Sequence, residues 1–142
     1  MTDPRAITML PGVQEDFATF EYDGSILYNV TLPGGSAQIG LAVSLTGNAT
    51  VGLTTDGSQV EGVLVKVADD GFCTVQNLGF CVMPAGNAAS LTIGKRIVGA
   101  VNASSAGGYI REVNTATAAE LGRCAHTIVD PSTATAVVVE LD

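Results

Sequence analysis

Short runs of apolar residues, separated by turn-forming residues, follow one another along most of this sequence. The runs cover residues 25–32, 39–45, 49–54, 59–68, 72–82, 91–99, 108–113, 122–129 and 134–141. Asp56-Gly57 and similar pairs lie between them and supply the positive φ angles that tight hairpins need. A strand would place Val63, Val65 and Val67 on one face. Strands this short and this closely spaced predict an all-β fold, a compact sandwich or barrel-like domain.

One segment favours a helix. Residues 115–121 (TATAAEL) are rich in alanine, and Gly122 follows as a natural C-cap. The segment is long enough for about two turns. We therefore expect at most one short helix.

The first 24 residues differ from the rest. Pro4 and Pro11 occur among isolated apolar residues without a period, which argues against a central strand or a long helix. We expect residues 1–24 to form an extended N-terminal arm that ends in an edge strand over 17–22, and residues 25–142 to form a single β-rich domain. Apolar arm residues with nothing local to pack on are candidates for binding a partner. They are Ile7, Met9 and Leu10, together with the aromatic residues Phe17, Phe20 and Tyr22.

Composition and charge narrow the range of partners. The 142 residues are 46% hydrophobic but only 14% charged, against a usual charged share of about 25%. The formal net charge is −8, and the basic residues are scattered. Because phosphate backbones require a concentrated positive surface, we expect neither a nucleic-acid partner nor an anionic membrane partner. No run approaches the roughly 20 apolar residues of a membrane span.

The cysteines and the single histidine could contribute to a reactive site. Cys124 and His126 would share one face of a strand, so a nucleophilic pair or part of a metal site could start there. A zinc site would need further ligands, and Cys73 and Cys81 would have to converge from another hairpin. The simpler interpretation is a half-buried strand histidine beside a small apolar cysteine. We expect free thiols in a reducing cytoplasm and no catalytic residue, metal or cofactor.

Two other patterns are explained by ordinary structure. Gly94-Lys95 suggests a phosphate-binding loop, but Arg96 stands where that motif needs a hydroxyl residue, and a strand-like segment follows. Asp69-Asp70 directly precede Gly71, which is typical of a turn. Residues 39–43 also resemble residues 93–98. Either an internal duplication or a chance similarity between β meanders would account for this resemblance.

The order and spacing of several short glycine-containing segments resemble those in the head decoration (cement) proteins of tailed bacteriophages. These segments cover residues 40–43, 55–57, 60–64, 75–79, 93–99, 107–111 and 119–123. An apolar strand is predicted over residues 136–141. The resemblance extends from Leu27 to Leu141, and it depends on the order of these segments along the chain rather than on any single segment.

This resemblance implies a compact β domain of the β-tulip type that binds the outside of the expanded capsid. It implies a homotrimer, the major capsid protein as partner, and a place on the virion exterior after synthesis in the bacterial cytoplasm. Residues 1–22 would correspond to the arm that adds capsid contacts in such proteins. Arg96 and Arg111 are candidate interface residues, since arginine is enriched at interfaces, although a solvated strand face explains them equally well.

Other functions are compatible with parts of this sequence. A phage tail or fibre component would also be β-rich, but a repetitive shaft would show a strict short period. A carbohydrate-binding sandwich commonly presents aromatic platforms, whereas this chain has no Trp and three Tyr. A biotinyl- or lipoyl-like module needs a lysine at a hairpin tip, and neither Lys66 nor Lys95 fits. An enzyme remains an alternative, because sites can be grafted onto any fold.

Overall fold

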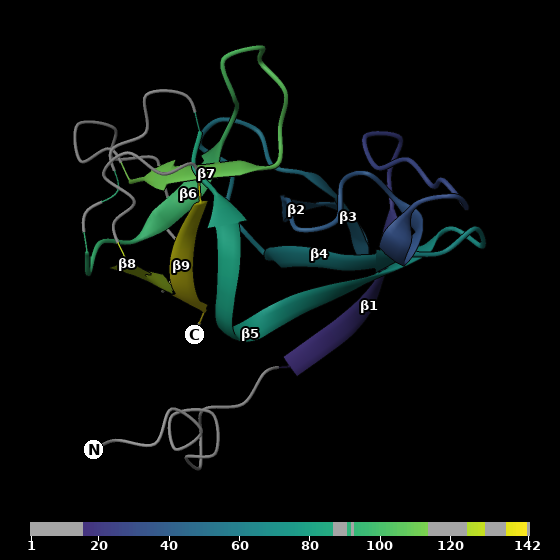
Figure 1. The fold of residues 1–142 in the computed structure, drawn as a ribbon, viewed down its shortest axis with the longest axis horizontal. Coiled ribbons are helices and arrows are strands. Elements are labelled where there is room, and N and C mark those ends of the chain that lie inside the picture. Colours follow the sequence, from purple (N-terminus) through teal and green to yellow (C-terminus); the bar gives the residue numbers. More distant parts are fainter. Residues whose placement is uncertain (1–15, 87–90, 92, 114–124, 130–135, 142) are drawn as a thin grey trace.

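The computed structural model describes residues 16–86, 91, 93–113, 125–129 and 136–141 (Figure 1). The strands are β1 (Asp16–Tyr22), β2 (Ala42–Gly47), β3 (Thr50–Leu53), β4 (Gly62–Val67), β5 (Phe72–Pro84), β6 (Ile97–Ala100), β7 (Tyr109–Glu112), β8 (Ala125–Val129) and β9 (Ala136–Leu141). A short 3-10 turn, η1 (Pro33–Gly35), precedes β2. The described chain is therefore built on strands, which confirms the predicted all-β fold. The segment 115–121, predicted to be helical, lies outside the described residues.

Strands β1, β3, β2, β4 and β5 form a closed ring. They pair in that order, and β1 then pairs antiparallel with β5. The β1–β3 pair is parallel and joins Glu21 to Thr50 and Tyr22 to Val51. Because β1 pairs with β3 at Glu21 and Tyr22, this end of the strand predicted to lie at an edge is part of the body of the domain. Residues 16–20 pair with β5 and have no strand on the other side among the described residues.

Strand β5 connects this ring to a second sheet. Its residues 72–78 pair with β1 and β4, whereas residues 79–84 pair antiparallel with β9, and β8 pairs with β9 beyond it. The strand bends sharply between the two halves (Figure 1). Gly79, at the change of partners, has φ of +96°, a backbone conformation that residues with a Cβ rarely adopt.

A separate hairpin of β6 and β7 is fixed to the ring by close backbone contacts. Thr54 is fully buried, and its hydroxyl donates to the carbonyl of Tyr109 (2.9 Å) and accepts from the amide of Gly108 (3.0 Å). On the other side of the hairpin, the amide of Gly99 donates to the carbonyl of Ser58 (2.7 Å). These bonds satisfy backbone groups that the hairpin would otherwise leave unpaired.

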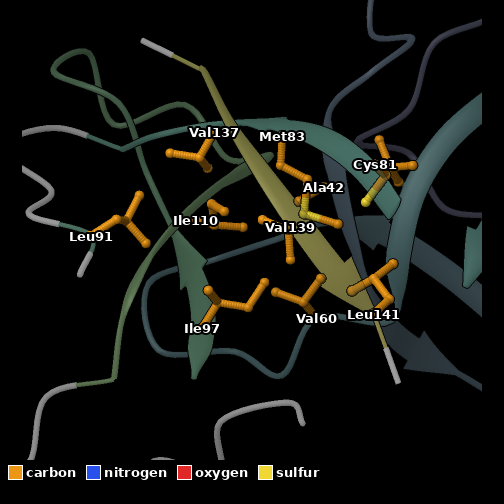
Figure 2. Close-up of a cluster of buried hydrophobic side chains, with 11 residues drawn as sticks. Ala42, Val60, Cys81, Met83, Leu91, Ile97, Ile110, Val137, Val139 and Leu141 are labelled. Atoms are coloured by element: carbon orange, nitrogen blue, oxygen red, sulfur yellow. The ribbon is translucent and has the colours of Figure 1, made fainter. Parts of the chain in front are cut away.

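Two clusters of buried side chains form the core. The ring encloses one cluster, made of Ile26, Val43, Val51, Leu64, Val67, Cys73 and Val75. The other lies between the second half of β5, β9 and the β6–β7 hairpin, and it contains Ala42, Val60, Val63, Cys81, Met83, Leu91, Ile97, Ile110, Val137, Val139 and Leu141. Figure 2 shows this second cluster, with side chains from β5, β6, β7 and β9 meeting in one layer.

Strand β4 corrects the prediction that Val63, Val65 and Val67 share a face. Val63 and Val65 contact the second cluster, but Val67 belongs to the cluster inside the ring together with Leu64. The pairing of β4 with β5 shifts between Leu64 and Lys66, where two residues of β4 oppose one of β5. A bulge of this kind moves the following side chains to the other face.

The strand predicted over residues 25–32 is also wrong. The structure has a loop there, in which the Asn29 side chain accepts from the amide of Thr31 (3.1 Å) and forms a local turn. Asparagine favours such turns because its side chain competes with backbone partners.

Candidate interaction surfaces

The loop of residues 24–41 stands out because it is long, ordered by its own polar side chains and free of charged residues. Gln38 holds its two ends together: its side-chain oxygen accepts from the amide of Leu27 (2.7 Å), and its side-chain nitrogen donates to the carbonyl of Ser25 (2.7 Å). Ser25 also receives a hydrogen bond from the amide of Leu53 on β3 (2.9 Å). The 24–41 loop is therefore tied to the ring.

Asp23 anchors the start of this loop. Its carboxylate accepts hydrogen bonds from the amide and the hydroxyl of Ser25. Burial by itself would raise the pKa of Asp23, but the hydrogen bonds from Ser25 and Thr46 outweigh it and leave the pKa below its ordinary value. A carboxylate held by several donors in this way resists displacement and fixes the entry of the loop.

The middle of the loop lies against β4. A Cβ atom on Gly35 would come within 2.0 Å of the carbonyl oxygen of Val67, so only glycine permits this approach. The amide of Asn29 donates to the carbonyl of Gly35 (2.7 Å), which folds the outer part of the loop back onto its base. Ile26 points inward and joins the core of the ring.

Three apolar side chains project outward from this fixed base. Leu27 is 65% exposed, Val30 is 74% exposed and Tyr28 is 38% exposed. Single exposed apolar residues are ordinary, but three within four consecutive positions form a small apolar surface. We call Leu27, Tyr28 and Val30 the loop tip. The 24–41 loop that carries it is drawn in purple to blue on the right of Figure 1.

Strand β1 provides a second surface. It pairs with β3 only through Glu21 and Tyr22, so its residues 16–20 have no strand on that side among the described residues. Phe17 lies on this stretch with its side chain 53% exposed. Open strand edges can pair with a strand from another chain.

The predicted partner-binding residues differ in how exposed they are in the structure. Phe17 is exposed, whereas Phe20 and Tyr22 pack against the core of the ring. The Tyr22 hydroxyl donates to the carbonyl of Ala68 (2.7 Å). Ile7, Met9 and Leu10 lie outside the described residues. Of the aromatic residues in the predicted set, Phe17 is the one most accessible to a partner.

The two predicted interface arginines also differ. Arg111 forms an ion pair with Asp56, with 2.9 Å between Nε and Oδ1, and donates to the carbonyl of Glu112 (3.0 Å). Its guanidinium is therefore engaged within the chain. Arg96 is exposed on the approach to β6, and its carbonyl accepts from the amide of Val113 (3.1 Å).

A shallow, open hollow of about 200 Å³ lies on the outer side of the ring. Its lining includes Lys66, Asp70, the half-exposed Phe72 and Cys73, whose buried side chain belongs to the core of the ring. Burial raises the pKa of Cys73 to about 11, so the thiol stays protonated near neutral pH. A protonated thiol is a poor nucleophile, and the hollow therefore has a wall of mixed charge without an activated group.

The pair Cys124 and His126 falls largely outside the described part of the structure. Cys124 lies outside the described residues, and so does the side chain of His126. Among the residues with described side chains, no group of three or more His, Cys, Asp or Glu side chains is placed to hold a metal ion. The described part of the chain also has no helix long and apolar enough to cross a membrane.

No protein-family model matches this sequence, and no curated protein is significantly similar to it. The inference of function therefore depends on the geometry of the surfaces. Sequence reasoning missed the loop tip because it took residues 25–32 for a strand. The available signal was the charge-free stretch that begins after Asp23 and the Pro33-Gly34-Gly35 turn within it.

Proposed function

We propose that this protein is a non-enzymatic structural component of a tailed-phage virion. It binds the outer surface of the capsid and stabilises the expanded head by bridging neighbouring major capsid protein subunits, as a homotrimer. The observation that carries the proposal is a stiff, ring-closed β body that offers an open strand edge with an exposed Phe17. The major capsid protein is proposed as the partner because the glycine-containing segments resemble those of decoration proteins.

The ring is suited to bridging because its ends cannot move independently. The closing β1–β5 ladder extends from Asp16 to Glu21, and Thr54 ties the β6–β7 hairpin to the same body. A rigid body transmits load between two contacts instead of stretching. Many copies on a shell also add their small contacts together, so each contact can be weak.

The open edge of β1 is the proposed capsid contact. An extended segment of the major capsid protein would add as a strand beside residues 16–20, and its main-chain groups would bond those of β1. Phe17 would be covered in the process, which supplies the apolar part of the contact. The net charge of −8 disfavours attachment to DNA released around the particle.

The test uses the full-length purified chain and expanded heads assembled without it from the cognate major capsid protein. We expect saturable co-sedimentation at a fixed ratio and a higher temperature of head disruption. Phe17→Asp is expected to weaken retention about tenfold or more, because it places a charge in an apolar contact. Val82→Asp is the matched control, since Val82 is 57% exposed on the other half of β5.

Both variants alter exposed positions, so each should melt like the original protein. Failure of the unmodified chain to bind expanded heads would overturn the proposed function. If the Phe17→Asp variant binds expanded heads as tightly as the unmodified chain, the edge of β1 is not the capsid contact.

A further inference from the structure

The sequence contains three Asp-Gly pairs, Asp23-Gly24, Asp56-Gly57 and Asp70-Gly71. This dipeptide is chemically labile, because glycine has no side chain to shield its amide nitrogen from the preceding carboxyl group. The nitrogen attacks Cγ of the protonated aspartic acid, an N–Cγ bond forms, and the amide proton leaves with the carboxyl hydroxyl as water. The product is a five-membered succinimide ring. How fast each pair reacts in the folded chain depends on what holds its two reacting groups.

Hydrolysis of the succinimide returns the water in one of two ways. Breaking the N–Cγ bond restores aspartate, whereas breaking the bond between the nitrogen and the original main-chain carbonyl carbon produces isoaspartate. In isoaspartate the main chain passes through Cβ and Cγ, so it is longer by a methylene group, and the former main-chain carbonyl becomes the free carboxylate. The cycle needs no oxidant or reductant, because water is released in the first step and taken up in the second.

Both reacting groups of Asp56-Gly57 are engaged in the structure. The Asp56 carboxylate forms its ion pair with Arg111, with 2.9 Å between Oδ1 and Nε. The amide of Gly57 donates to the carbonyl of Gly99 (2.9 Å). These bonds would have to break before the nitrogen could attack the carboxyl group, so we expect this pair to react slowly.

The carboxylate of Asp23 is held by several donors. It accepts hydrogen bonds from the amide and the hydroxyl of Ser25, and Thr46 supplies a further side-chain hydrogen bond. These bonds keep the pKa of Asp23 below its ordinary value, which lowers the fraction of the protonated acid that reacts. A Cβ on Gly52 would lie 2.1 Å from Asp23 Oδ2, so the carboxylate is also packed against β3. We expect this pair to react slowly as well.

Asp70-Gly71 is held less tightly than the other two pairs. Asp70 is exposed in the turn between β4 and β5, and among the described residues no hydrogen bond is donated by the Gly71 amide. Asp70 Oδ1 accepts from the amide of Phe72 (3.1 Å), which folds the carboxyl group over the Gly71 peptide. Nothing lies within 4 Å of the position that a Cβ of Gly71 would take, so the turn has room to rearrange. We therefore propose that Asp70-Gly71 is a modification site, at which the folded chain converts aspartate to isoaspartate.

The site lies where β1 is bonded to the β4–β5 hairpin. The Gly71 carbonyl accepts from the amide of Tyr22 (3.2 Å), and the Tyr22 hydroxyl donates to the carbonyl of Ala68 on the other side of the turn (2.7 Å). The added methylene group of isoaspartate displaces Gly71 relative to Ala68, so the two bonds cannot both keep this geometry. Modification therefore loosens this end of β1. The inference goes beyond capsid binding and does not depend on it.

Incubation of the full-length chain in heavy-oxygen water, followed by peptide mapping with mass spectrometry, tests the proposal. Each passage through the succinimide places a solvent oxygen in the carboxyl group, and electron-transfer fragmentation distinguishes isoaspartate from aspartate of equal mass. Label and isoaspartate should appear at Asp70 about tenfold or more faster than at Asp23 and Asp56, where hydrogen bonds must first break. The same chain unfolded in urea should label the three pairs at similar rates, because the fold no longer protects any of them.

Asp70→Glu is the variant that removes the reaction, because attack on the longer side chain would have to close a six-membered ring. Asp69→Glu is the matched control at the neighbouring exposed position, and it should react at Asp70 like the original chain. Circular dichroism melting checks that both variants fold. The isoaspartate form, separated from the fresh chain by ion exchange, should melt at a lower temperature.

Equal labelling of the three pairs in the native chain would overturn the proposal. So would a preference for Asp70 that persists in urea, since the fold would then not be its cause, or a native chain that stays unlabelled at Asp70 while the unfolded chain reacts. An isoaspartate form that melts like the fresh chain would overturn the loosening of β1.

Discussion

The side-chain amide of Gln76 donates a hydrogen bond of 2.9 Å to the carbonyl oxygen of Phe80, across the bend of β5. The same nitrogen donates to the carbonyl of Leu78 (3.2 Å), so one buried side chain spans the point where β5 leaves the ring and joins β9. Gly79 adopts its positive φ between these two carbonyls. The bend is thus held by a glycine that permits it and a glutamine that bonds the carbonyls on either side.

Replacing Gln76 by leucine should destabilise the protein. The variant keeps most of the side-chain volume but removes the donor shared by Leu78 and Phe80, and the loss of a buried hydrogen-bonding group costs about 1–3 kcal/mol. Urea unfolding followed by circular dichroism measures the change. Gln59→Leu is the control, because Gln59 is exposed. Equal stability of the two variants would show that the amide does not hold the bend.

Gly62→Ala should be far more damaging than Gly24→Ala. A Cβ on Gly62 would lie 2.1 Å from the carbonyl oxygen of Gln76 on the neighbouring strand, so β4 and β5 would have to separate. Forcing extra volume into such a site costs about 1–3 kcal/mol or more. Gly24 has nothing within 4 Å of the same position, and its substitution should stay within about 0.5 kcal/mol. Thermal melting of both variants makes the comparison, and a tolerated Gly62→Ala would contradict the close packing of this pair.

Cys73 should resist thiol reagents until the ring opens. Its side chain is buried, and burial raises its pKa from the ordinary 9.0 to about 11, so little thiolate exists at pH 8. Alkylation of the native chain at pH 8, mapped by mass spectrometry, should label Cys73 slowly, and denaturant should make it fast. Rapid labelling of Cys73 in the native protein would contradict its burial.

The same pKa shift predicts how stability depends on pH. A group whose pKa is raised by folding contributes its full stability below the ordinary value, here about pH 9, and loses it as pH rises through about 11. The free energy of unfolding should therefore fall across this window. Cys73→Ala should flatten the fall, apart from the share due to Tyr22, whose pKa is raised by burial and then by Asp70 and Asp69.

Local signals predicted most strands because they act over a few residues. Asp56-Gly57 and Asp70-Gly71 mark real turns, and both glycines have positive φ. The expected β strand over 25–32 failed for a different reason. Its backbone is satisfied by Gln38, more than ten residues away, and by the side chain of Asn29. Hydrophobic pattern alone does not reveal that a distant amide will replace a neighbouring strand as the partner.

The candidate surfaces depended even more on long-range contacts. Phe17, Phe20 and Tyr22 look alike in sequence, yet pairing with β5 turns Phe20 and Tyr22 toward the core and leaves Phe17 outside. Arg111 and Arg96 were equivalent until the fold brought Asp56 to the first of them. A side chain becomes available to a partner only when its own chain leaves it uncovered, and that depends on residues far away in sequence.

The sequence by itself determined the all-β character, the positions of most turns and the charge-free stretch after Asp23, because backbone propensity and charge are local properties of residues. Only the tertiary structure decided that β1 closes a ring with β5, that a bulge in β4 moves Val67 to the other core, and that Leu27 and Val30 face solvent. Each of these depends on the register between segments that are far apart in the chain, and a one-residue shift in register exchanges the inner and outer faces of a strand.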